Sequence, residues 1–116
     1  MFFEEHALGR ISVASGGFNK GQPHLYALSF AGPVPYVKIG KTSDIWTRFM
    51  RLRREANMHG FAVVDAWASH SSDKAARWER RLIKALPEQS PRHSKEYYHG
   101  ADFHQVVALA KKIVGT

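Results

Sequence analysis

Apolar and polar residues alternate in blocks along the chain, and their spacing predicts where strands and helices lie. His24–Phe30 is rich in aromatic and apolar residues, which is typical of a strand, and Tyr36–Gly40 has the same character. The intervening Ala31–Pro35 contains one glycine and two prolines, which interrupt strands and favour turns. The pattern therefore predicts a hairpin with a five-residue loop.

Helical spacing begins immediately after this hairpin. Ser43 and Asp44 are residues that cap helices, and the apolar positions then recur every three or four residues from Ile45 until His59–Gly60. Phe61–Ala68 follows as a third strand. Its candidate core residues are Phe61, Val63, Val64 and Trp67.

Two more helices are predicted in the second half of the chain. Ser71–Asp73 offers an N-cap for the first, and Pro87 stops it. Asp102 offers an N-cap for the last helix. The inward positions of the two helices are Ala75, Trp78, Leu82 and Leu86, and then Phe103, Val106, Val107, Ala110 and Ile113.

The resulting order, β-β-α-β-α-α with a short extended piece at Glu96–His99, predicts an α+β fold. We expect a small three-stranded antiparallel sheet flanked by helices. Residues 24–116 form one domain in this interpretation, and residues 1–23 form an N-terminal arm or extension. The glycines and serines among residues 1–23 are typical of turns and loops, and they fit an extended arm, a short hairpin or a dimer contact equally well.

Charge and composition narrow the functional class. The 116 residues contain 17 Lys and Arg against 10 Asp and Glu, a formal net charge of +7, which favours polyanionic partners. No apolar run approaches the roughly 18–20 residues of a membrane span, and Met1–His6 lacks the apolar core of a secretory signal. The chain has no cysteine, which excludes disulfides and thiolate metal sites and is consistent with a cytoplasmic location.

Four short motifs along the chain contain residues that could take part in catalysis. Tyr26 ends His24-Leu25-Tyr26 in the first strand, and the second strand contains Lys38-Ile39-Gly40-Lys41. Arg48 follows Lys41 by seven residues, and Glu79 begins Glu-Arg-Arg-Leu-Ile-Lys in a later helix. Taken together, these motifs resemble the GIY-YIG nuclease superfamily, in particular a phage-associated branch with a Lys-Ile-Gly second motif.

The resemblance implies a role for each matching residue. Tyr26 is similar to the first-motif tyrosine, Lys41 to the lysine after the second-motif glycine, and Arg48 to the phosphate-binding arginine. Glu79 is similar to the single carboxylate that binds Mg²⁺ or Mn²⁺. A single carboxylate suits Mg²⁺, because this ion keeps several of its waters and takes few protein ligands.

The sequence departs from the family pattern at several positions. Lys38 replaces the second-motif tyrosine, and Leu52 stands where several members have Tyr or His. The usual Asn after Glu79 is missing, and Glu96-Tyr97-Tyr98 resembles the Gly-Glu-Trp-Phe segment of the phage-associated branch. Three residues are therefore candidates for the general base, namely Tyr26 by resemblance and His24 and Lys38 by their chemistry.

The sequence hypothesis is a metal-dependent endonuclease that hydrolyses phosphodiester bonds in DNA. RNA fits the same pattern, and a homodimer or a partner protein would supply specificity. The alternatives are a catalytically inactive nucleic-acid-binding module of the same fold and a basic protein-interaction domain. The residues expected to bind the nucleic-acid backbone are Lys41, Arg48, Arg51, Arg53, Arg54, Arg80 and Arg81.

Overall fold

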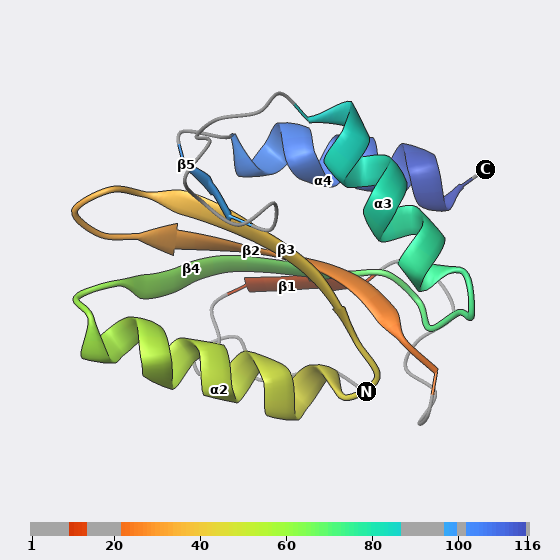
Figure 1. Cartoon of the computed structure of the whole chain (residues 1–116). Helices are drawn as coiled ribbons and strands as arrows, with labels where there is room; N and C mark the ends of the chain where they lie inside the picture. Colours follow the sequence, from red (N-terminus) through yellow and green to blue (C-terminus); the bar gives the residue numbers. More distant parts are fainter. Residues whose placement is uncertain (1–9, 14–21, 87–96, 100–101, 116) are drawn as a thin grey trace.

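A twisted sheet with helices on both faces forms the body of the protein (Figure 1). The computed structural model describes residues 10–13, 22–86, 97–99 and 102–115. Within these residues the sheet has five strands in the order β1-β4-β2-β3-β5. The strands are β1 (Arg10–Val13), β2 (His24–Ala31), β3 (Tyr36–Thr42), β4 (Ala62–Ala68) and β5 (Tyr97–His99).

The three central strands are antiparallel, as the sequence predicts. β2 pairs with β3 on one side and with β4 on the other. The register between β2 and β4 shifts after Ser29, so that Ser29 lies opposite Asp65 but Phe30 lies opposite Val63. Val64 falls at this irregularity and is 45% exposed, so its assignment to the core was wrong. A β-bulge changes the direction of side chains in this way, and sequence alternation does not reveal it.

One helix covers the first face of the sheet. Helix α2 (Ile45–Met58) buries Ile45, Phe49, Leu52 and Ala56, which follow the predicted helical spacing. They pack on alternate residues of the central strands, including Tyr26, Leu28 and Phe30. The α2 face of the sheet is therefore the face that carries the first-motif tyrosine.

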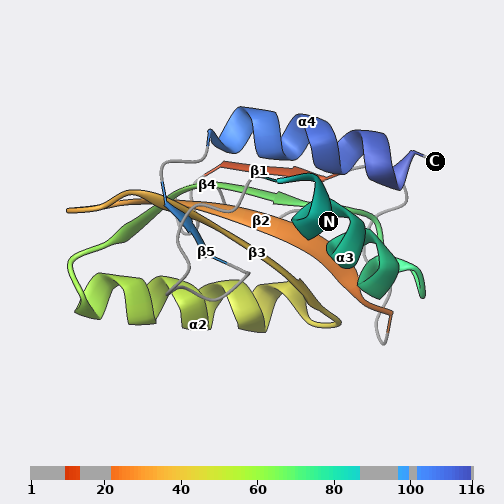
Figure 2. The same cartoon turned by 45° about the horizontal axis from the view of Figure 1, so that its top comes forward.

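Two helices cover the opposite face, as Figures 1 and 2 show. Helices α3 (Ala75–Ala85) and α4 (Phe103–Val114) bury their apolar stripes against Leu25, Ala27, Val37, Ile39 and Trp67. In the described part of the chain, no helix is both long and apolar enough to cross a membrane.

The sheet extends beyond the predicted three strands at both edges. β1 comes from the N-terminal arm and pairs in parallel with β4. β5 coincides with the predicted extended piece and pairs antiparallel with β3. Two of the three predicted N-caps are confirmed, because Asp44 and Asp102 cap their helices. The third prediction was wrong, because α3 begins after Lys74 without a side-chain cap. The Ser72 hydroxyl instead accepts the Lys74 N–H in the turn that precedes α3.

Candidate functional site

The first-motif tyrosine and the second-motif glycine are direct neighbours across the β2–β3 hairpin. Tyr26 lies opposite Gly40 in the register and is completely buried. A β-carbon on Gly40 would lie 2.5 Å from the Tyr26 hydroxyl oxygen and 2.7 Å from Cζ. The tyrosine ring therefore lies across the glycine, and no larger residue fits at position 40 without displacing it.

Arg48 approaches the same tyrosine from α2. Its Nη1 donates to the Tyr26 hydroxyl oxygen at 3.5 Å, the long end of the hydrogen-bonding range. The next residue, Phe49, packs edge-on against the Tyr26 ring with 5.3 Å between centroids. The structure thus brings three of the sequence motifs together, because Gly40, Tyr26 and Arg48 form one continuous set of contacts.

The turn from β3 into α2 holds Arg48 and Lys41 near each other. Asp44 caps α2, since its carboxylate accepts the backbone N–H of Thr47 at 3.1 Å and the Thr47 hydroxyl at 2.9 Å. The Asp44 N–H in turn donates to the Thr42 hydroxyl at 3.1 Å. These local bonds fix the start of the helix, and Arg48 lies one turn later.

An open cleft of about 410 Å³ lies at this junction. Two cations, Lys41 from β3 and Arg48 from α2, contribute to its wall. Its described lining residues are Pro23, Lys41, Thr42, Ser43, Arg48 and Ala76. Because Ala76 belongs to α3, helices that cover opposite faces of the sheet both contribute to the wall of the cleft.

Glu79 follows Ala76 by three residues on α3, so the two share one face of the helix. The Glu79 side chain is partly buried. Among the residues that the structure describes, no group of three or more His, Asp or Glu side chains converges to hold a metal. Glu79 is not among the described residues that line the cleft, so the structure connects it to the cleft only through Ala76 on the same helix. As a single carboxylate it fits Mg²⁺ that keeps several waters, and not an ion caged entirely by protein ligands.

His24 is almost completely buried, which its position at the start of a strand does not indicate. It is 1% exposed, and its Nδ1–H donates to the Ser69 carbonyl oxygen at 2.8 Å, since that oxygen can only accept. Burial lowers the pKa of His24 below its ordinary value of 6.5, and the nearby His70 lowers it further against the opposing effect of the Ser69 hydrogen bond. His24 is therefore a neutral ring near pH 7.

Ser69 is a structural residue that the sequence analysis missed. It is fully buried directly after β4. Its hydroxyl accepts the Leu25 N–H at 3.0 Å and donates to the His70 carbonyl at 2.7 Å. Its own N–H donates to the Leu25 carbonyl at 2.8 Å. Ser69 thus ties the end of β4 to the start of β2, two residues before Tyr26. No pattern in the sequence marks a single serine for this task.

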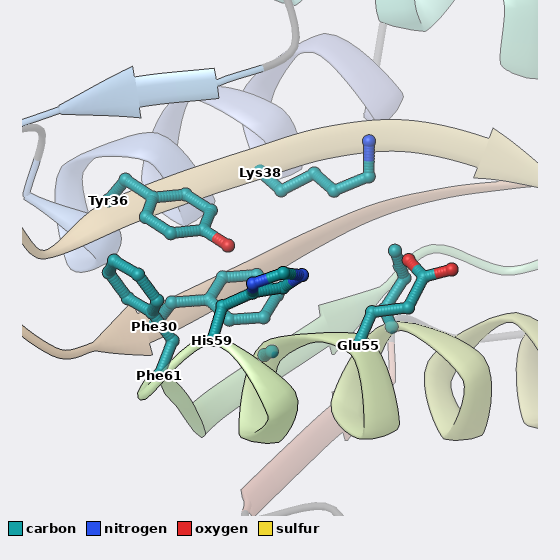
Figure 3. Close-up of a pocket in the computed structure, with 8 residues that line it drawn as sticks. Phe30, Tyr36, Lys38, Glu55, His59 and Phe61 are labelled. Carbon is teal, nitrogen blue, oxygen red and sulfur yellow. The ribbon is translucent and has the colours of Figure 1, made fainter.

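Lys38 is 5% exposed and lines a second cavity, between β3 and the C-terminal half of α2 (Figure 3). Tyr36, Glu55 and His59 contribute to the same cavity. The sequence analysis singled out Lys38 but not these three residues. The sequence does contain a signal for Glu55 and His59. They follow Arg48 by seven and eleven residues, and Leu52 follows it by four, which is the spacing of residues on one side of a helix.

The arginines expected to bind nucleic acid fall into two separate groups. Arg51 and Arg54 are exposed on α2, whereas Arg80 and Arg81 are exposed on α3. The two pairs therefore lie on helices that cover opposite faces of the sheet. Arg53 is partly buried on α2. Glu96 lies outside the described residues.

The comparison with known families adds an independent finding. A family model described as the T5orf172 domain matches residues 23–114. No curated protein and no solved structure matches the chain. The matched range contains β2, β3, α2, β4, α3, β5 and α4, and with them every residue of the cleft. Since this range is most of the 116 residues, the chain belongs to the T5orf172 domain family.

Proposed function

We propose that this protein is a GIY-YIG-type endonuclease that hydrolyses phosphodiester bonds in DNA with a divalent metal. Membership of the T5orf172 domain family supports a nucleic-acid-related role. The net charge of +7 supports a polyanionic substrate. The order of Tyr26, Gly40, Arg48 and Glu79 along the chain supports the GIY-YIG assignment.

One observation carries the proposal, which is the position of Arg48 between the cleft and the buried tyrosine. Arg48 lines the cleft together with Lys41, and its Nη1 contacts the Tyr26 hydroxyl. A phosphate in the cleft would accept hydrogen bonds from both cations, and the same cations would stabilise the charge that develops on its oxygens.

Tyr26 is the residue to which we assign activation of the attacking water. A guanidinium beside the hydroxyl stabilises negative charge on that oxygen. In its phenolate form, Tyr26 would take a proton from water while the water oxygen bonds to phosphorus and the bond to the leaving sugar oxygen breaks. Tyr26 is fully buried. The proposed mechanism therefore requires the groups packed around the Tyr26 hydroxyl to shift when substrate binds, with Arg48 still within reach of that oxygen.

Glu79 is the residue that would hold the metal, with water and substrate phosphate completing the coordination. Its partly buried carboxylate lies on the face of α3 that also carries Ala76 of the cleft. A divalent ion bound there would supply charge stabilisation for the phosphate and the leaving oxygen.

Nicking of supercoiled plasmid by the parent protein and the Glu79→Gln variant tests this function, with Mg²⁺, Mn²⁺ or EDTA. We expect the parent to nick with either metal and to stop with EDTA. Glu79→Gln keeps the side-chain shape but removes the charge that a hard cation needs, so it should fold, bind DNA and not cut. Asp73→Asn is a matched control, because Asp73 is an exposed carboxylate just before α3. Nicking by Glu79→Gln at the parental rate would remove the metal assignment.

A nucleic-acid-binding module without catalysis is the second candidate. The lysine at the second-motif tyrosine position and the full burial of Tyr26 favour it. The same assay separates the two, because a binder would retard DNA in a gel and leave the plasmid supercoiled with every metal.

A further inference from the structure

The second cavity has a volume of about 480 Å³ and an uneven distribution of side-chain types. Figure 3 shows aromatic rings gathered toward one end, with Lys38 and Glu55 toward the other and His59 between them. Phe30 and Tyr36 stack with 4.6 Å between centroids and 11° between planes. Phe61 meets Tyr36 edge-on at 5.4 Å. The described lining residues are Phe30, Tyr36, Lys38, Leu52, Glu55, Ala56, His59 and Phe61.

This cavity and the cationic cleft lie along the same stripe of α2. Arg48 belongs to the cleft, and Glu55 and His59 belong to the cavity. Glu55 follows Arg48 by seven residues, which keeps the two on one side of the helix, roughly 10 Å apart at 1.5 Å per residue, and His59 is the C-cap residue just after α2. On β3, Lys38 of the cavity and Lys41 of the cleft are three residues apart, so they point to opposite faces of the strand and the two sites share α2 alone. A ligand held at the cleft by a phosphate group would extend toward the cavity along α2.

The chemistry of the lining favours a planar heterocycle over a second phosphate. Tyr36 and Phe61 are partly buried and line the cavity, so their rings offer surface against which an aromatic ligand packs favourably, whereas Phe30 is 2% exposed and stacked on Tyr36. The Glu55 carboxylate would repel an anion, but it accepts hydrogen bonds from ring N–H and amino groups. The Lys38 ammonium donates hydrogen bonds to ring nitrogens and carbonyl oxygens.

We propose that this cavity binds one nucleobase of the substrate, next to the phosphate held by Arg48 and Lys41. The proposal rests on the proposed nuclease function and adds base selectivity to it. Guanine is the best match. Its adjacent N1–H and N2 amino donors suit the two oxygens of Glu55, and its O6 and N7 acceptors suit Lys38. Thymine has only one ring N–H between two carbonyls, so it lacks the adjacent donors.

Binding of short oligonucleotides in EDTA tests the proposal without any need for cleavage. The probes are fluorescein-labelled oligothymidylates with a central thymine, guanine or abasic site, and their Kd is measured by fluorescence anisotropy. We expect the guanine probe to bind about 10-fold or more tightly than the all-thymine probe, an order typical of one bidentate base contact. The abasic probe should bind no better than the all-thymine probe.

Two exposed positions on α2 provide the variant and its control. Glu55→Gln replaces one of the two acceptor oxygens with an amino donor, so the ratio of the Kd values for the all-thymine and guanine probes should fall to within about 2-fold. Asn57→Ala, two residues away on an exposed part of the same helix, should keep the full preference. Retention of the preference in Glu55→Gln would overturn the assignment of this cavity.

The outcomes separate this inference from the nuclease proposal. Equal binding of all three probes overturns the nucleobase site and leaves the nuclease standing. A guanine preference lost in Glu55→Gln supports the site, even if the plasmid assay finds no cutting and so overturns the nuclease. Absence of binding to every probe at low salt overturns the nucleobase site, and absence of nicking in the plasmid assay as well overturns the nuclease.

Discussion

The hydroxyl of Tyr26 occupies the space directly over Gly40, where a β-carbon would meet it at 2.5 Å. Real β-carbon contacts essentially never fall below 3.0 Å, and the Tyr26 ring is fully buried and packed edge-on against Phe49. Glycine is therefore required at position 40 because the side chain of its cross-strand neighbour leaves no room for a β-carbon. The backbone conformation does not require glycine there, because Gly40 does not have a positive φ.

Substitution of Gly40 by alanine should lower the free energy of unfolding by about 1–3 kcal/mol, the usual cost of overpacking a core. Urea denaturation of the parent and of Gly40→Ala measures the change. The penalty should shrink in a Tyr26→Leu background, where the hydroxyl and the distal ring are gone. An equal penalty in both backgrounds would show that the two positions are not coupled.

Arg48 should affect the rate of cleavage far more than its arginine neighbours on α2. It contacts Tyr26 and lines the cleft, whereas Arg54 is exposed six residues later on the helix. We expect Arg48→Ala to lose about 100-fold or more in kcat, the order found for single groups that stabilise a transition state. Arg54→Ala should lose much less. Single-turnover cleavage at saturating protein measures both, and similar losses would place the reacting phosphate elsewhere.

Affinity for DNA should depend steeply on salt, because the contacts to the backbone release counterions. Each phosphate contact contributes a slope of roughly −0.9 in log K against log salt concentration. Arg51 and Arg54 are exposed three residues apart on α2, so the double variant Arg51→Ala/Arg54→Ala should flatten the slope by up to about 1.8. Anisotropy titrations between low and moderate salt give the slope, and a parent slope near zero would remove nucleic acid as the partner.

Acid should destabilise the fold through His24. Its pKa in the folded protein lies below the ordinary value of 6.5, mainly because of burial, so the unfolded chain binds the proton more readily. The free energy of unfolding should therefore fall as the pH drops below about 6.5, and level off once the pH passes the lowered folded pKa.

Chemical denaturation from pH 8 to pH 5 measures this dependence, and NMR titration of the ring follows His24 directly. The variant His24→Asn removes the titrating group but keeps a donor near the Ser69 carbonyl. Its stability should vary less with pH than that of the parent. An identical pH profile in the variant would assign the acid sensitivity to other groups.

The central fold was predictable because local signals and long-range packing agree there. The glycine and prolines between β2 and β3, the Asp44 cap and the spacing of Ile45, Phe49 and Leu52 each act over a few residues, and the structure confirms them. The bulge at Val64 and the pairing of β1 with β4 depend on strands that are distant in sequence. No local pattern encodes them.

The sequence predicts which residues belong to the candidate site, but it does not predict most of the contacts that they make. The spacing from Lys41 to Arg48 is a helical feature at a capped turn, and the two residues do share a cleft. By contrast, the burial of His24 depends on Ser69, which is 45 residues away in sequence. The cavity around Lys38 depends on how α2 packs over β3, so the part played by Glu55 and His59 emerges only in three dimensions.

The parallel pairing of β1 with β4 has a consequence for the order in which the chain folds. Arg10 lies opposite Asp65, more than 50 residues further along the chain, whereas the β2–β3 hairpin closes a short loop. The entropic cost of closing a loop grows with its length, so the β2–β3 hairpin forms at a low entropic cost. β1 can pair only after β4 has joined the sheet, so it is expected to dock later. Until β1 arrives, the backbone groups along one edge of β4 remain open to pairing with another chain. A chain shortened to the family-matched residues 23–114 keeps that edge open permanently, so it should associate edge to edge at concentrations where the longer chain does not.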